Sequence, residues 1–150
     1  MEIVVGVDGS PVAVAVLQAA VAEARLRRAK LHVVHVVYVP ATWVDGMTFM
    51  PGTVIDSAYE AAAAVKKSVW DRVTAALEGT DVEWVQVDLD GYPPDEVVEY
   101  AKRIEADLIV VGSRGYGDLK SLLLGSTSHR VSHLSPCDVL IVKTKSEVTP

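Results

Sequence analysis

The sequence predicts an α/β fold in which one open parallel β-sheet carries helices on both faces. Short runs rich in valine and isoleucine alternate with longer helical segments, which gives the order βαβαβαβαβ. Strands that alternate with helices pair in parallel through right-handed crossovers. A chain of 150 residues, half of them hydrophobic, is long enough for one substantial core, so residues 1–150 are expected to form a single domain.

The first strand and the first helix are expected within residues 2–29. Residues 2–7, EIVVGV, form a short apolar run of the kind found in strands buried on both faces. Ser10 is expected to cap the following helix, with Pro11 at its first position, where a missing N–H costs nothing. The helix, residues 12–29, is rich in alanine and ends in arginines that suit the negative end of a helix dipole.

The middle of the chain predicts a strand, a loop, a helix and an outer strand. Residues 30–39 form a second apolar run, whereas residues 40–52, with two prolines and two glycines, are typical of a long loop. A second helix is expected over about 53–78, ending at Gly79. Polar and apolar residues alternate in DVEWVQVDL, residues 81–89, which predicts an outer strand with one face in water.

The last third of the chain predicts two more strand and helix pairs. Residues 91–106 open with two prolines and acidic residues and place apolar side chains on one helical face. Residues 107–113, DLIVVGS, form a fourth buried strand. Residues 125–136 form a short helix, and residues 137–143, CDVLIVK, form the final strand.

The topology also predicts where a ligand binds. The first and fourth strands are the most uniformly apolar, so they are expected at the centre of the sheet. Ligands of open parallel sheets bind outside the carboxyl ends of the strands, where the winding of the chain reverses. The loops that follow Val7 and Val111 should therefore lie side by side at the binding site.

Composition excludes several classes of protein. The net charge of −6 and the pI near 5.1 argue against a nucleic-acid-binding protein, which needs a basic surface. The longest uncharged stretch, residues 31–44, falls short of the roughly 18 residues of a membrane-spanning helix, and the start lacks the basic residues of a signal peptide. Cys137 has no cysteine partner and is expected to be a small buried side chain. These features predict a reduced, cytoplasmic protein without a membrane partner.

Two glycine steps follow the fourth strand and precede the last helix. Gly112, Gly115 and Gly117 would shape the first loop, and glycine lets the backbone approach a ligand closely. Gly125 is followed by Ser126, Thr127 and Ser128 at the start of a helix, where free N–H groups favour an anion. Arg114 and Lys120 could add positive charge. The alternative is that the glycines only turn the chain and that Ser126 only caps the helix.

The spacing of the glycines excludes two other phosphate-binding motifs, and one alternative ligand stays open. No G-x-x-x-x-G-K-[ST] run of a P-loop occurs, and the segment after the first strand, GVDGSP, lacks the G-x-G-x-x-G spacing of dinucleotide-binding proteins. A flavodoxin-like fold would share this architecture, so FMN remains an alternative ligand on the fold alone.

The sequence resembles the universal stress protein family along essentially its whole length. The similar segments are GVDGS after the first strand, Gly91-Tyr92-Pro93, and DLIVVGSRG…LLLGSTS…SPCDVLIVK. Gly112 and Gly115, nine residues, then Gly125 and Ser126 match the G-2x-G-9x-G-(S/T) pattern of the ATP-binding branch. The resemblance implies a Rossmann-like five-stranded sheet of order 3-2-1-4-5, and an adenine-nucleotide site at the point where the winding reverses.

The resemblance also implies the site residues, the ligands and the partner. It assigns the nucleotide contacts to Gly6, Val7, Asp8, Val36, Val111, Gly112, Arg114, Gly115, Gly125, Ser126, Thr127 and Ser128. It implies ATP or another adenine nucleotide, with Mg²⁺ or Mn²⁺ accompanying the phosphates and Asp8 as a possible metal ligand. It implies a homodimer through the last strand, with Val139, Leu140, Ile141 and Val142 at the interface, and an apolar exposed edge also invites such pairing.

Several residues keep two interpretations at this stage. Asp8 could contact ribose or a metal ion, or its carboxylate could only stabilise the DGS turn. His129 and His133 are spaced to share a metal on a helix, but no third ligand is evident and an exposed helix face is preferred. His32 and His35 should point to opposite faces of their strand.

Three functions fit the sequence. The first is a nucleotide-binding regulatory module of the stress response, acting as a homodimer. The second is a slow ATPase or phosphotransferase, although no dedicated base is evident and His129 is only a candidate. The third is an interaction protein with an empty pocket, against which the intact glycine pattern argues. Trp43, Phe49 and Met50 could form a lid or a dimer patch, or pack down on the sheet.

Overall fold

The computed structural model describes residues 1–38, 51–113 and 124–143, and within them five parallel strands form one sheet in the order β3-β2-β1-β4-β5. The strands are β1 (Glu2–Val7), β2 (Lys30–Val37), β3 (Trp84–Asp90), β4 (Leu108–Gly112) and β5 (Asp138–Val142). The helices are α1 (Ala13–Arg27), α3 (Gly52–Leu77), α4 (Pro93–Arg103) and α5 (Ser126–Leu134). The predicted class, strand order and parallel pairing are confirmed. Most of the expected 40–52 loop, with Trp43, Phe49 and Met50, lies outside the described residues.

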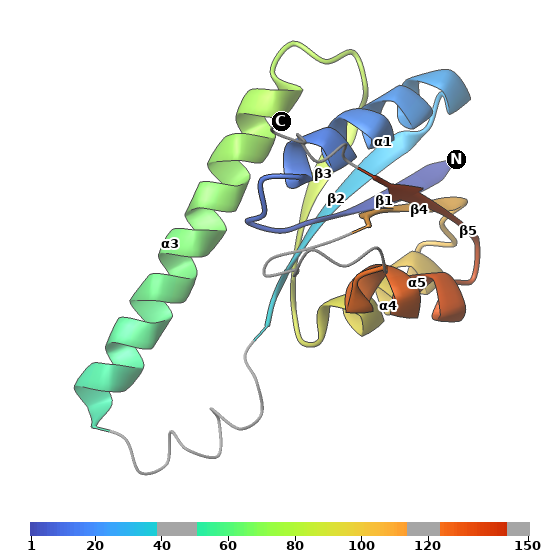
Figure 1. Cartoon of the computed structure of the whole chain (residues 1–150). Coiled ribbons are helices and arrows are strands. Elements are labelled where there is room, and N and C mark those ends of the chain that lie inside the picture. Colours follow the sequence, from blue (N-terminus) through green and yellow to red (C-terminus); the bar gives the residue numbers. More distant parts are fainter. Residues whose placement is uncertain (39–50, 114–123, 144–150) are drawn as a thin grey trace, which may run out of the picture.

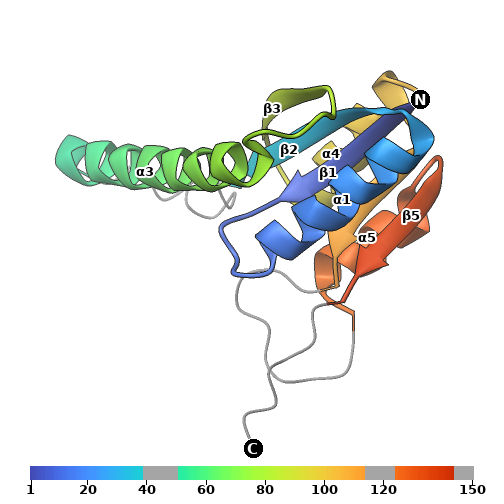
Figure 2. The same cartoon turned by 90° about the horizontal axis from the view of Figure 1, so that it is seen from above.

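Helices cover both faces of the sheet (Figures 1 and 2). Alternate residues of β1 point to opposite faces: Ile3 and Val5 pack with α1 and the last turns of α3, whereas Val4 packs with α4 and α5. Each face of the sheet therefore has its own apolar layer, which explains why the inner strands are continuous runs of apolar residues. The earlier turns of α3 extend away from the sheet (Figure 2).

The edge strands differ from the central ones in burial. β3 alternates exposed and half-buried residues along its length. This confirms the outer strand that the alternation of polar and apolar residues predicts. β5 forms the opposite edge and pairs only with β4 among the described strands, so Val139 to Val142 are half-buried. The central placement of β1 and β4 is likewise confirmed.

The start of α1 differs from the prediction. The N-cap position is Val12, which makes no capping bond through its side chain, so the expected cap at Ser10 is wrong. Pro11 lies in the turn before the helix rather than at its first position. The cause is Asp8, whose Oδ1 accepts the N–H of Ser10 at 2.9 Å and closes a turn ahead of the helix. Arg72 of α3 donates to the Gly9 carbonyl at 3.2 Å and holds the same turn.

Candidate nucleotide pocket

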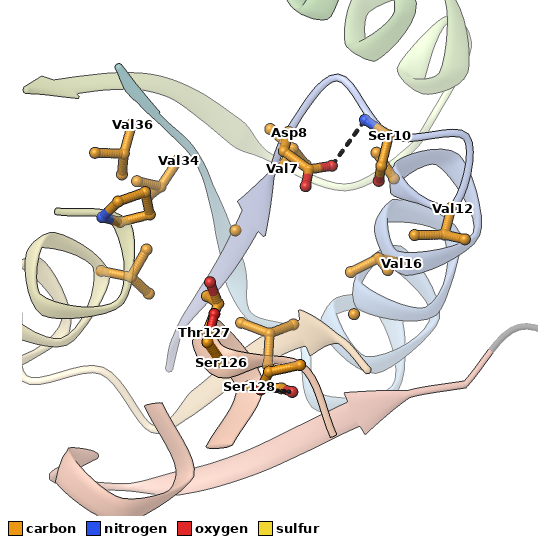
Figure 3. A pocket seen from close by; sticks show the side chains of 17 residues that line it. Val7, Asp8, Ser10, Val12, Val16, Val34, Val36, Ser126, Thr127 and Ser128 are labelled. Atoms are coloured by element: carbon orange, nitrogen blue, oxygen red, sulfur yellow. Dashed lines mark hydrogen bonds between the residues drawn. The ribbon is translucent and has the colours of Figure 1, made fainter. Parts of the chain in front are cut away.

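A cavity of about 210 Å³ opens at the carboxyl edge of the sheet, between the first turns of α1, α4 and α5 (Figure 3). Every sequence-predicted site residue that the structure describes lines it: Gly6, Val7, Asp8, Val36, Val111, Gly112, Gly125, Ser126, Thr127 and Ser128. Arg114 and Gly115 lie outside the described residues. The residues of two distant chain segments thus meet at one place, as the topology predicted.

The pairing of β1 with β4 brings these segments together. Val5 lies beside Val110, so the ends of the two strands are neighbours. From there the chain leaves β1 towards α1 on one face of the sheet, whereas α5 lies on the other face with α4 (Figure 1). This divergence opens a crevice above the strand ends, which is where ligands bind in open parallel sheets.

The side of the cavity formed by β2 and α4 is apolar. Val34 and Val36 lie two residues apart on β2 and share a face, and Pro93 and Val97 lie one turn apart on α4. Pro93 and Pro94 occupy the first two positions of α4, so this helix start lacks two of the N–H groups that such positions normally expose. This wall therefore suits a flat apolar group better than an anion.

Another side of the cavity is polar and contains the start of α5, whereas the α1 side adds the apolar residues Val12, Ala13 and Val16. Gly125 is its N-cap residue and no side chain caps the helix, so the first amides keep their capacity to donate to a ligand. The Gly125 N–H donates to the Ser113 carbonyl at 2.8 Å, which ties the helix start to the end of β4. The positive end of the α5 dipole therefore faces the cavity from a fixed position.

The hydroxyl groups at the start of α5 are not equivalent. Ser128 is 1% exposed, and its Oγ lies 3.0 Å from the Gly125 carbonyl and 3.2 Å from that of Ser113. Its single proton is directed to protein oxygens, so Ser128 mainly holds the loop in shape. Ser126 and Thr127 project towards the interior of the pocket (Figure 3).

Asp8 lies at the end of β1 and lines the cavity. Its Oδ1 accepts the Ser10 N–H, as the turn interpretation predicted. The carboxylate also remains part of the cavity wall, so forming the turn does not remove it from the site (Figure 3). Across residues 1–38, 51–113 and 124–143 no group of three or more His, Cys, Asp or Glu side chains is placed to hold a metal ion.

A buried histidine of β2 holds the last residue of β1 in place. His35 is 6% exposed, and its Nδ1–H donates to the Val7 carbonyl at 3.1 Å. Its ring packs nearly perpendicular to that of Trp70, with 6.3 Å between the ring centroids, and Trp70 Nε1–H donates to Asp88 at 2.9 Å. Burial acts to raise the pKa of Asp88, but hydrogen bonds from Trp70, Gln86 and Lys66 outweigh it and hold that pKa below its ordinary value.

The remaining candidate residues lie away from the cavity. His32 contacts Glu2 and Tyr100 on the face opposite to His35, as predicted from their spacing. His129 and His133 are exposed on α5, which agrees with the preferred helix-face interpretation. Cys137 is half-buried, and burial raises the pKa of its thiol.

Sequence reasoning missed part of the lining. The additional residues are Ser10, Val12, Ala13, Val16, Val34, Pro93 and Val97. Val34 could have been found, because it lies two residues before Val36 on the same strand face. Ser10 was missed because it was assigned to a helix cap, which hid its position in the wall.

Comparison with known proteins identifies the family. A model of the universal stress protein family matches residues 1–143. Universal stress protein YxiE of Bacillus subtilis is 37% identical over 148 residues, which cover 95% of this chain and 98% of that protein. No helix among the described residues is long and apolar enough to cross a membrane.

Solved structures agree with this relationship. The universal stress protein from Archaeoglobus fulgidus in complex with dAMP has a TM-score of 0.70 and 25% identity, covering 95% of this chain and 98% of that one. A universal stress protein in complex with cAMP has a TM-score of 0.64 and 29% identity, covering 95% and 96%. The chain therefore belongs to the universal stress protein family.

Proposed function

We propose that this protein binds an adenine nucleotide in the cavity at the carboxyl edge of its sheet and acts as a nucleotide-dependent regulatory module. The observation that carries the proposal is the division of one cavity into an apolar wall and a helix start with free amides. Relatives of the same fold in complex with dAMP and cAMP support the choice of adenine.

The base is assigned to the apolar side that β2 and α4 form. Val34, Val36 and Val97 offer a surface for a flat ring, and burying apolar area there favours binding. Gly6 also lines the cavity, and the absence of a side chain there leaves room for the nucleoside.

The phosphate is assigned to the start of α5. Backbone amides, the helix dipole and the hydroxyls of Ser126 and Thr127 favour a negative group at this position. Arg114 and Gly115 belong to the proposed contacts through the glycine motif, together with Gly112 and Gly125.

A divalent ion fits this site only together with the nucleotide. Among the described residues Asp8 is the one carboxylate in the cavity wall, which is too few ligands for a metal held by the protein alone. Mg²⁺ or Mn²⁺ would therefore bind through phosphate oxygens, with Asp8 as a further ligand or as the partner of a bound water.

The proposed assembly is a homodimer that pairs through β5. This strand is an edge of the sheet, and the side chains of Val139 to Val142 are half-buried rather than covered. An apolar edge strand with unpaired backbone groups favours pairing with a second copy.

Extraction and titration test the proposed function. Protein purified without added nucleotide is denatured, and released compounds are separated by chromatography; AMP, ADP, ATP and, as a control, GTP are titrated by calorimetry. We expect saturable binding of adenine nucleotides that exceeds binding of GTP. ATP that stays intact over hours supports the regulatory module, whereas accumulating ADP supports the slow ATPase. No affinity for any adenine nucleotide would contradict the proposal.

A further inference from the structure

Two histidines share the outward face of α5. His129 and His133 are spaced i, i+4 on this helix, so their side chains lie side by side, with about 5 to 6 Å between the Cβ atoms. Both are exposed, whereas Ser128 and Val131 form the buried face of the helix. The two histidines line an open surface hollow of about 540 Å³, together with Leu124, Ser126, Arg130 and Leu134.

This pair of histidines has the geometry of a metal chelate. Imidazole nitrogen is a preferred ligand of Zn²⁺, and two histidines spaced i, i+4 on one helix face can bind the same ion. Because His129 and His133 are both exposed, an ion reaches them without a change in the fold. Neither residue lines the proposed nucleotide cavity, so the hollow on α5 is a separate place on the molecule.

The positive charge nearest in sequence to the two histidines is balanced by α4. Arg130 Nε donates to Asp95 Oδ1 at 2.5 Å, and its Nη2 donates to Asp95 Oδ2 at 3.0 Å. The guanidinium also lies 5.7 Å from the centre of the Tyr92 ring, at the start of α4. This bidentate ion pair directs the charge of Arg130 towards α4 and offsets its repulsion of a cation at the histidines.

One chain supplies only half of a zinc site. Structural Zn²⁺ takes four ligands in a tetrahedron, but the described part of the chain holds no group of three or more His, Cys, Asp or Glu side chains placed for a metal ion. The same two histidines of a second copy would complete the tetrahedron. Leu124 and Leu134, which are 42% and 39% exposed at the two ends of the hollow residues, would add apolar area to such a contact.

We propose that His129 and His133 of two copies of this chain together bind one Zn²⁺ ion, which joins the copies through the outward faces of their α5 helices. A two-fold axis through the ion brings the same patch of both copies together, as in most homodimers. This contact uses a different surface from the β5 edge, because the histidines lie on the helix. It is independent of the nucleotide, and it makes the assembly of the protein respond to zinc.

Zinc titration of the full chain, without a purification tag, tests this site. Calorimetry gives the affinity and stoichiometry, and sedimentation velocity gives the mass with and without Zn²⁺, for wild type, His129→Ala, His133→Ala and Ser132→Ala. Ser132 is the matched control, because it is exposed on the same helix but does not line the hollow. Alanine favours helix, so all three variants keep α5.

Wild type is expected to bind one Zn²⁺ per two chains, and its mass should at least double and return to the starting value when EDTA removes the ion. Each histidine variant should bind zinc at least about tenfold more weakly, because the loss of even an outer-shell partner of a metal costs that much. Neither variant should gain mass at zinc concentrations that saturate wild type. Ser132→Ala should behave as wild type in both measurements.

Other results would overturn the proposal at different points. One Zn²⁺ per chain with no change in mass would refute the bridge between two copies. Zinc binding of undiminished affinity in both histidine variants would place the ion elsewhere, for example at the thiol of Cys137. A gain in mass that persists in both variants would assign the association to another surface. Absence of zinc binding by wild type would refute the site, and the proposed nucleotide function would be unaffected.

Discussion

Gly6→Val is expected to weaken nucleotide binding at least about 100-fold while the protein stays folded, a loss of roughly 3 kcal/mol in binding free energy. A Cβ at Gly6 would lie 3.6 Å from Val111 Cγ1 and 3.8 Å from Val97 Cγ2, which are ordinary contact distances. The fold therefore accepts the first carbon. The two γ-methyl groups of valine must then occupy space in the cavity, beside Val97 and Val111, that the nucleoside needs.

A graded series makes this prediction sharp. Gly6→Ala should weaken binding by about tenfold and Gly6→Val by far more, because valine adds more side-chain volume than alanine. Gly52→Ala is the control, because among the described residues no atom beyond its chain neighbours and its own helix backbone lies within 4 Å of the Cβ added there. Affinity is measured by calorimetry, and circular dichroism confirms the fold. Unchanged affinity in Gly6→Val would show that the nucleoside does not lie over Gly6.

Leu31→Ala is expected to lower the free energy of unfolding by about 3 to 4 kcal/mol. Leu31 is fully buried on β2, where it is paired with Ile3 of β1 and Trp84 of β3. Its truncation leaves a cavity between the sheet and the layer of α1 and α3, which well-packed neighbours fill only in part. Such a loss is a large share of the stability of a domain of this size.

Denaturant unfolding measures this loss, with Leu26→Ala as the matched control. Leu26 is the same residue type on α1 but is 79% exposed, so its truncation should change the unfolding free energy by less than about 0.5 kcal/mol. A loss below about 1 kcal/mol for Leu31→Ala would mean that the layer between β2 and α1 is not tightly packed.

The central part of the fold could be predicted because its physical cause is local. Strands buried on both faces need continuous apolar runs, and the sequence has them in β1, β2 and β4, whereas the alternation in β3 marks an edge. The direction of winding reverses between β1 and β4. This topology alone predicts the position of the cavity, without any knowledge of side chains.

What could not be predicted depends on competition between side chains. Ser10 has the residue type of a helix cap, and only the structure places the helix start at Val12 and the serine in the cavity wall. The sequence shows three hydroxyls after Gly125, but not that Ser128 directs its own to protein carbonyls. The loss of amide donors at Pro93 and Pro94 matters only once α4 is known to border the cavity.

A two-dimensional NMR titration with ATP and Mg²⁺ tests the central claim most directly, because it reports binding and its location together. We expect the largest amide shifts at Gly6, Gly112 and Ser126, at the carboxyl edge of the sheet. Amides at the opposite edge, such as those of Lys30 and Glu83, serve as internal controls and should not move. Absent shifts, or shifts centred on that opposite edge, would contradict a nucleotide site in this cavity.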